Sequence, residues 1–155
     1  MNFFNEDDAQ SAKEASCYVT IGGKRYLAFM AKNFEAKLKI TTKEVPSLGK
    51  LIQGRKATGA EGTFKLTIYK CTEIFDDIVT KYKETGKMER FTIQTTNEDK
   101  ASSMGRSTKT YKNCIIDGDV LLSMFDVSGD FIEQEISGYF SDYTSSEKYK
   151  NPVGM

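Results

Sequence analysis

Apolar and polar residues alternate along much of this chain, most clearly between Phe34 and Lys43. On an extended strand the apolar residues share one face and the charged or polar ones the other: Phe34, Ala36, Leu38 and Ile40 against Glu35, Lys37, Lys39 and Thr41. Successive side chains of a strand point to opposite faces, so this period of two predicts a half-buried strand with one polar face. Pro46 is expected to interrupt pairing near its end.

Seven further segments are predicted as strands: Cys17–Ile21, Arg25–Ala31, Thr63–Lys70, Phe91–Thr96, Tyr111–Ile116, Val120–Val127 and Phe131–Phe140. Gly22 and Gly23 supply the positive φ angles of a tight hairpin. A polar loop is expected over 97–108, and a turn at Asp117 and Gly118. The side chains expected in the core are those of Phe64, Leu66, Ile68, Ile132, Ile136 and Phe140.

One helix is predicted, from Glu73 to about Glu84. Its apolar stripe has i, i+4 spacing and consists of Ile74, Phe75, Ile78, Val79 and Tyr82. Thr72 is a suitable N-cap, acidic residues in the first turn suit the positive end of the helix dipole, and Gly86 suits the position after the helix. We assign this stripe to core packing.

Many short strands with one helix favour a mainly β fold, a sandwich or barrel with a helix on its flank. The length of 155 residues suits one domain. We place that domain at residues 17–143. Residues 1–16 are predicted to be a flexible polar arm, and residues 144–155, within a segment that is polar from Ser141, a flexible tail.

Composition excludes several function classes. Lys plus Arg equals Asp plus Glu, at 22 each, whereas a dedicated nucleic-acid binder carries a basic excess. The chain contains no histidine, which removes the commonest general base and metal ligand, and its three cysteines are far apart. We therefore expect reduced thiols, no cofactor, no metal site and no catalysis. No signal peptide and no membrane-spanning run is visible.

The segment from Leu48 to Gly62 is long, basic and rich in glycine, and we expect a loop there. The spacing of Gly54 and Gly59 resembles a phosphate-binding loop, but Ala60 and Glu61 follow where Lys and Ser or Thr are needed, and the next element is a strand. Leu48, Leu51 and Ile52 are apolar within this exposed segment. Apolar groups on a long surface loop indicate a partner.

A resemblance to a known family is carried by the same region. The run GRKATGAEGTFKLTIYK, followed by a short helix, resembles the tail tube proteins of contractile-tailed, myovirus-type phages and PBSX-like defective prophages. The matching residues are Gly54, Arg55, Thr58, Gly59, Gly62, Tyr69 and Lys70. The Gly-Gly hairpin, the Phe34-Glu35-Ala36 strand opening and an acidic strand near the end agree with it, over roughly residues 17–143.

The resemblance implies a tail-tube β-barrel or sandwich with a flanking helix, six copies in a ring and rings stacked into a tube whose lumen conducts DNA. The expected location is the virion tail, assembled in the host bacterial cytoplasm, with sheath, baseplate and terminator proteins as partners. It also implies that the loop contacts the neighbouring ring. The expected inter-ring residues are Leu48, Lys50, Leu51, Ile52, Arg55 and Lys56.

Charge is unevenly distributed along the chain. Between Asp117 and Glu147 lie eight acidic residues and no Lys or Arg, whereas six basic residues lie between Lys43 and Lys70 against Glu44 and Glu61. Complementary surfaces fix register in a head-to-tail stack, and an acidic inner wall repels DNA phosphates. We therefore expect Glu133 and Glu135 to face the lumen, where DNA passes without specific binding.

Two alternatives remain at this point. Glu133 and Glu135 share one strand face at a spacing of roughly 7 Å, close to that of glycosidase carboxylates, but a flat strand without histidine or tryptophan argues against catalysis. The alternative function is a hexameric, ring-forming effector or adaptor of the type VI secretion kind. Such rings share the implied fold and lack the glycine-rich segment.

Overall fold

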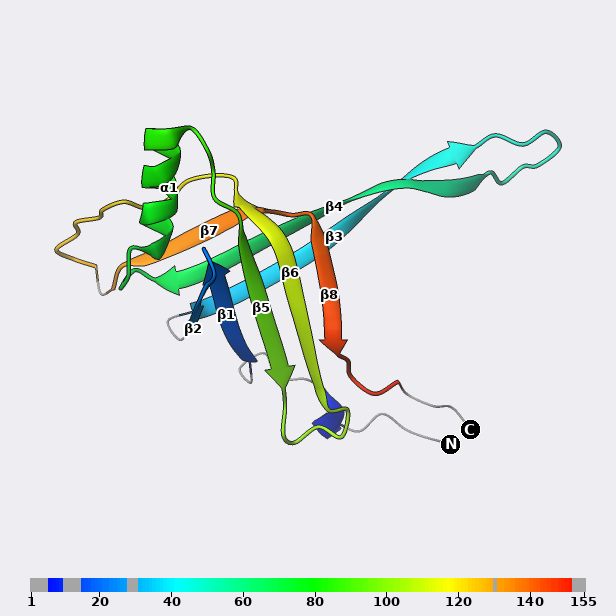
Figure 1. Cartoon of the computed structure of the whole chain (residues 1–155). Coiled ribbons are helices and arrows are strands. Elements are labelled where there is room, and N and C mark those ends of the chain that lie inside the picture. The colour runs from blue at the N-terminus through cyan, green and yellow to red at the C-terminus, as the bar shows by residue number, and fades with distance from the viewer. Residues whose placement is uncertain (1–5, 10–14, 28–30, 130, 152–155) are drawn as a thin grey trace.

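The computed structural model describes residues 6–9, 15–27, 31–129 and 131–151 (Figure 1). These residues contain eight strands, one α-helix and a short 3-10 helix. In chain order they are η1 Glu6–Asp8, β1 Ala15–Ile21, β2 Lys24–Leu27, β3 Ala31–Val45, β4 Gly54–Tyr69, α1 Ile74–Thr85, β5 Phe91–Glu98, β6 Arg106–Ile116, β7 Glu133–Phe140 and β8 Asp142–Glu147.

The strands form one antiparallel sheet in the order β2-β1-β5-β6-β7-β4-β3, with β8 also paired to β6. Strand β6 joins two layers: its first part pairs with β5 and β8, and Ile115 and Ile116 pair with β7. Asn113, just before this change of partner, has a φ of 55°. In Figure 1 the strands β1, β5, β6 and β8 cross the direction of β3, β4 and β7. The predicted mainly β fold with one flanking helix is confirmed, as an open sheet folded over itself.

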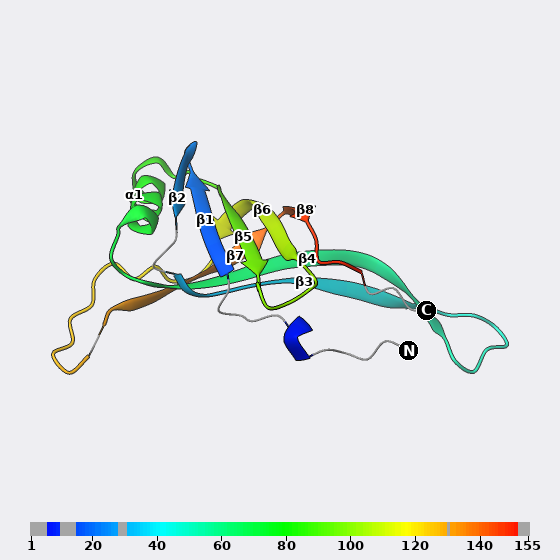
Figure 2. The ribbon, with the colours of Figure 1, turned by 90° about the horizontal axis from the view of Figure 1, so that it is seen from below.

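The core lies between the two layers and beneath α1, which is on the same side of β3, β4 and β7 as the other strands (Figure 2). Phe91 of β5 lies at its centre, with edge-to-face contacts to Phe64 at 5.8 Å and to Phe75 of the helix at 6.0 Å between ring centroids. Such pairs stabilise a core beyond the apolar area that they bury. The predicted core positions Phe64, Leu66, Ile68, Ile136 and Phe140 are all buried.

Helix α1 agrees with the prediction except at its first residue. Gly86 adopts the left-handed conformation, with φ 74°, and its N–H donates to the Tyr82 carbonyl. The N-cap is Glu73 rather than Thr72, although the Thr72 hydroxyl accepts a bond from the Ile74 N–H at 3.3 Å. A largely buried ion pair of 2.9 Å between Lys70 and Asp76 attaches the helix start to the end of β4.

The prediction of a strand at Val120–Val127 is wrong, because this segment is irregular. Its apolar residues follow one another instead of alternating, so no single face suits a sheet. Strand β7 begins at Glu133, and Ile132 is 41% exposed, which corrects its assignment to the core. Likewise Leu38 and Ile40, on the apolar face of β3, are exposed because β3 continues beyond the body of the domain.

Two segments predicted as loop or tail contain strands. Strands β5 and β6 reduce the 97–108 loop to residues 99–105. Strand β8 occupies part of the polar segment after Ser141, so a tail beginning at 144 is not what the structure shows. Its Ser, Thr and Tyr residues pair with the outer edge of β6, and Glu147 forms an ion pair with Arg106. A strand edge needs partners for its N–H and C=O groups, and β8 supplies them.

Three predictions reach beyond the described residues: those for residues 1–5 and 10–14 of the arm, for 152–155 of the tail, and for 28–30 of the second strand. The second strand is described over Lys24–Leu27, after a hairpin turn in which Gly22 and Gly23 have φ of 59° and 81°. In the part of the chain that the structure describes, no helix is long and apolar enough to cross a membrane, and no cluster of side chains suits a metal ion.

The pairing of β6 with β7 depends on Gly138, because a side chain at this position has no room. A Cβ at Gly138 would lie 1.9 Å from the Ile115 carbonyl oxygen, and this backbone atom cannot move without breaking the ladder. We predict that Gly138→Ala lowers the free energy of unfolding by about 1–3 kcal/mol or more. Gly59→Ala is the matched control, because a Cβ at Gly59 meets nothing within 4 Å. Equal urea midpoints for both variants would contradict this account.

Candidate assembly interface

Strands β3 and β4 extend past the body of the domain as a hairpin arm, defined here as residues 38–62 (Figures 1 and 2). Continuous antiparallel pairing runs from Leu38 with Gly62 to Val45 with Gly54, with one irregularity at Thr41 and Thr42. The eight residues Leu38–Val45 span about 25 Å at the usual rise of a strand. Apart from Gln53, which is half-buried, and Gly62 at its base, every residue of the arm is exposed.

The arm corrects the prediction of a loop from Leu48 to Gly62. Residues 54–62 belong to β4, and only residues 46–53 form the connection. The β-branched Thr41, Thr42 and Thr58 favour an extended backbone, and the glycines need no special conformation there, because the φ angles of Gly54 and Gly59 are not positive. The segment predicted as a loop is therefore a strand ladder with a short tip.

The tip, residues 46–53, is held by its own polar groups. The Gln53 side chain accepts from the Ser47 N–H at 2.6 Å and donates to the Lys50 carbonyl at 2.7 Å. Gly49 takes the left-handed conformation that the turn requires, with φ 79°. The apolar side chains point away from this scaffold: Leu48, Leu51 and Ile52 are 103%, 99% and 84% exposed. The tip thus presents apolar side chains from a fixed backbone.

The six residues predicted for the inter-ring contact are divided between two places. Four of them lie together on the tip: Leu48, Lys50, Leu51 and Ile52. The other two, Arg55 and Lys56, lie on β4 next to the tip. Arg55 donates from Nε to the Thr42 hydroxyl at 2.9 Å and from Nη2 to the Thr42 carbonyl at 3.1 Å. Arg55 therefore braces the two strands of the arm.

Glu133 and Glu135, the predicted lumen residues, lie on the exposed face of β7. Neither is isolated, because Lys32 contacts Glu133 at 2.9 Å and Lys65 contacts Glu135 at 3.5 Å. The hydrogen bond to Glu133 raises the pKa of Lys32. On β3 the hydrogen bond from Lys37 likewise lowers the pKa of Glu35.

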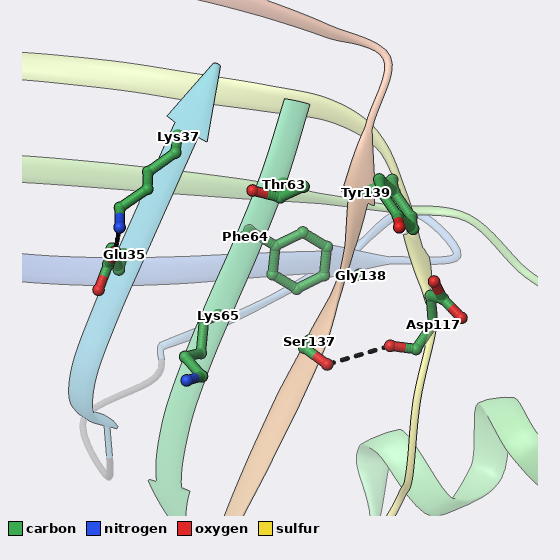
Figure 3. Close-up of a pocket in the computed structure, with 9 residues that line it drawn as sticks. All are labelled: Glu35, Lys37, Thr63, Phe64, Lys65, Asp117, Ser137, Gly138 and Tyr139. Atoms are coloured by element: carbon green, nitrogen blue, oxygen red, sulfur yellow. Dashed lines mark hydrogen bonds and ion pairs between the residues drawn. The ribbon is translucent and has the colours of Figure 1, made fainter. Parts of the chain in front are cut away.

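The exposed face of β3, β4 and β7, called here the outer face, therefore carries both signs of charge. Antiparallel register places basic and acidic residues side by side: Lys32, Lys37, Lys39 and Lys65 with Glu35, Glu61, Glu133 and Glu135. Figure 3 shows part of this face, with Glu35, Lys37 and Lys65 beside a shallow groove near Tyr139 and Asp117. Glu61 and Asp117 raise the pKa of the Tyr139 hydroxyl. The face that carries Glu133 and Glu135 is therefore of mixed charge and not acidic.

A second exposed apolar surface was missed by reasoning from the sequence, because its residues had been assigned to strands. We call it the receptor loop, residues 119–129 and 131–132. Its exposed apolar side chains are Leu122, Met124, Phe125, Val127, Phe131 and Ile132. Adjacent apolar residues without alternation, at Val120–Leu122 and again at Met124–Phe125, were the available signal. A soluble chain rarely exposes so many large apolar groups together unless they contact a partner.

Comparison with known proteins shows the family to which this chain belongs. The model of the family described as phage tail tube protein matches residues 2–147. This chain belongs to the phage tail tube protein family. The family is structural, so the prediction of a structural protein rather than an enzyme is confirmed.

Curated relatives of this tail tube chain agree. It is 32% identical over 136 residues to the phage-like element PBSX protein XkdM of Bacillus subtilis (strain 168), covering 83% of this chain and 92% of the relative. It is 31% identical over 139 residues to YqbM of the same organism, covering 85% and 94%. The resemblance to PBSX-like prophage proteins is therefore confirmed.

Solved structures show the same fold at low identity. The tube-terminating cap of the anti-feeding prophage superposes with a TM-score of 0.68 at 11% identity, covering 94% of this chain and 95% of that one. A chain of the sheath–tube complex of the extracellular contractile injection system PVC gives 0.62 at 13% identity, covering 84% and 87%.

The exposed tip generates a prediction that separates folding from assembly. Val45 pairs directly with Gly54, so an Asn-Gly turn can replace residues 46–53 and close the hairpin. The free energy of unfolding should change by about 0.5 kcal/mol or less, because Leu48 and Leu51 have no neighbours to lose. Assembly into tubes, measured by sedimentation, should be lost.

A triple variant, Leu48→Ser, Leu51→Ser and Ile52→Ser, keeps the length of the tip and is the control for loop shortening. It should fail to assemble as well, because it loses the same apolar side chains. Normal sedimentation of either variant as tubes would show that the tip is not an assembly contact.

Proposed function

We propose that this chain is the repeating subunit of the inner tube of a contractile phage tail or tail-like particle. Six copies form a ring, and rings stack through the hairpin arm. The observation that carries this proposal is the arm itself: a ladder about 25 Å long that ends in three exposed apolar side chains. Such a projection buries nothing in its own subunit, so its apolar tip is explained by a neighbour.

The open sheet supports lateral association within a ring. The outer edge of β3 has no partner strand among the described residues, and unpaired N–H and C=O groups of an edge strand favour pairing with another chain. Closing these edges between subunits gives a continuous wall around a central channel. Rotation of identical subunits about one axis produces a closed ring of this kind.

The relatives support this placement. One is a protein of a phage-like element, and structural neighbours come from a sheath–tube complex, a sheath/tube terminator and a baseplate of contractile systems. On this proposal the chain contacts sheath, baseplate and terminator proteins in a virion tail assembled in the host bacterial cytoplasm.

The outer face suits the lining of the channel. No described strand covers it, and α1 lies on the opposite side of β3, β4 and β7 (Figure 2). Its four lysines are matched by four carboxylates, so it offers DNA phosphates little net positive charge. Since counterion release drives non-specific binding to DNA, a balanced wall permits passage without retention.

Electron microscopy of the purified protein tests the function. At high concentration we expect tubes with six-fold symmetry and a periodic repeat along the axis, and the variant with the excised tip should give no tubes. Isolated rings that never stack would contradict tube formation and favour the ring-forming secretion alternative. Monomers at every concentration would contradict both.

Charge reversal on the outer face tests the lining. In the double variant Glu133→Lys and Glu135→Lys, two ion pairs become like-charge contacts with Lys32 and Lys65. Exposed pairs contribute about 0–1 kcal/mol each, so we expect a folded subunit that still forms tubes. These tubes should retain short double-stranded DNA in co-sedimentation, whereas wild-type tubes should not.

The matched control is Asp77→Lys with Glu84→Lys, which reverses two exposed charges on α1. Control tubes should bind less DNA than those of the Glu133 and Glu135 variant. Equal retention would mean that overall charge governs the effect and that the outer face does not line the channel. Loss of assembly with folded monomers would instead place Glu133 and Glu135 at a subunit interface.

A further inference from the structure

The chain exposes two apolar clusters, and both need an explanation. The tip presents Leu48, Leu51 and Ile52. On the receptor loop, Phe125 and Val127 are 99% and 96% exposed, and Phe131 is 79% exposed. Single apolar residues scattered over a protein surface are common, whereas a cluster of large exposed apolar side chains indicates contact with a partner.

The two clusters lie at opposite ends of the molecule (Figures 1 and 2). Strand β4 connects them, because it starts at Gly54 beside the tip and ends at Tyr69 beside the receptor loop. At that end the Lys70 N–H donates to the Ile132 carbonyl at 2.8 Å, and the Tyr69 and Phe131 rings meet edge to face at 6.1 Å. Sixteen residues of strand span about 50 Å, so the clusters cannot meet within one subunit.

Hydrogen bonds within the receptor loop define a turn at residues 126–129. Asp126 accepts hydrogen bonds at Oδ1 from the Ser128 N–H at 3.0 Å and from its hydroxyl at 2.8 Å, and the Gly129 N–H donates to the Asp126 carbonyl. Beside this turn lies a hollow of about 250 Å³. Its apolar lining is formed by Met124, Phe125, Val127, Phe131 and Ile132.

The charges around the two clusters are complementary. Lys43, Lys50 and Lys56 surround the tip, where Glu44 is the single acidic residue among 43–56. Asp119 and Asp126 belong to the receptor loop, which contains no Lys or Arg in residues 119–129 and 131–132. Opposite charges at matching apolar surfaces select partners and fix their orientation.

We propose that the receptor loop of one subunit binds the hairpin tip of a subunit in the next ring. This inference rests on the proposed tube and adds the surface that receives the arm. Tip and receptor are different surfaces of the same chain, so the contact is heterologous and leaves one free tip and one free receptor at each end of a stack. Such a contact adds further rings in one direction, with a fixed polarity.

Site-specific cross-linking tests the contact. The background variant is Cys71→Ser, because Cys71 is the exposed thiol. Burial raises the pKa of Cys17 to about 11 and that of Cys114 to about 12, so these thiols react slowly. Tubes of Leu51→Cys with Phe125→Cys are treated with a short bismaleimide and separated by denaturing electrophoresis.

We expect a ladder of covalent multimers from the double variant, and monomers from Leu51→Cys alone and Phe125→Cys alone. Dimers from Leu51→Cys alone would indicate tip-to-tip contact and overturn the proposal. Tubes of the double variant without a ladder would overturn it too and leave the tube function standing. A Cys71→Ser parent that forms no tubes would instead contradict the proposed function.

A charge-reversal pair covers the case in which the cysteine variants fold but do not assemble. Lys50→Glu should reduce the sedimenting fraction at least several-fold, and adding Asp119→Lys should restore it towards the wild-type level. Asp119→Lys alone should impair assembly in the same way. Failure of the pair to recover, with both single variants impaired, would overturn the proposed pairing of tip with receptor loop.

Discussion

The antiparallel pairing of β3 with β4 is the interaction on which the rest of the structure depends. Over the body of the domain this ladder carries Phe64, Leu66 and Ile68 into the core, and β7 continues the sheet on its other side. Beyond the body the same hydrogen bonds hold a projecting arm that no core supports. One continuous strand thus connects the packed interior with a distant contact surface and sets the spacing between the two apolar clusters.

The types of residue along β4 change with the burial of the strand. Where one face is buried against the core and both edges are paired, apolar residues alternate with polar ones, and Gly62 and Gly138 allow close approach of Phe140 and β6. Where β4 leaves the body, threonine, lysine and alanine replace large apolar residues, which limits non-specific association along this strand. Apolar side chains return at the tip, where a specific contact is proposed.

Folding brings together charged residues that are far apart along the chain. Along the chain the basic residues before Lys70 and the acidic residues after Asp117 are separate blocks. In the sheet β4 and β7 are neighbours, so Lys65 reaches Glu135, and β3 brings Lys32 to Glu133. The blocks meet as ion pairs on the outer face, whereas the described side chains of the tip and the receptor loop, at opposite ends of β4, form no ion pair.

The predictions from the sequence succeeded where one local rule decided the outcome. Strand patterns identified β1, β5, the Thr63–Tyr69 part of β4 and most of β3 and β7, and the helical period with Gly86 identified α1. They failed where pairing partners decided: residues 54–62 are a strand because β3 is extended beside them, and 142–147 are a strand because β6 has an open edge. Val120–Val127 has no partner among the described strands, and its consecutive apolar residues present no single face to a sheet.

The amino-acid sequence by itself determined the mainly β class, the helix, the apolar core positions and the tail tube resemblance, because these depend on residue patterns within short segments. Only the tertiary structure decided that the glycine-rich segment is part of a paired hairpin arm, that Glu133 and Glu135 are paired with lysines, and that a second apolar surface lies at the far end of β4. Each of these depends on which distant strands become neighbours, and strand pairing between residues far apart in sequence is set by the burial of the whole sheet rather than by any local pattern.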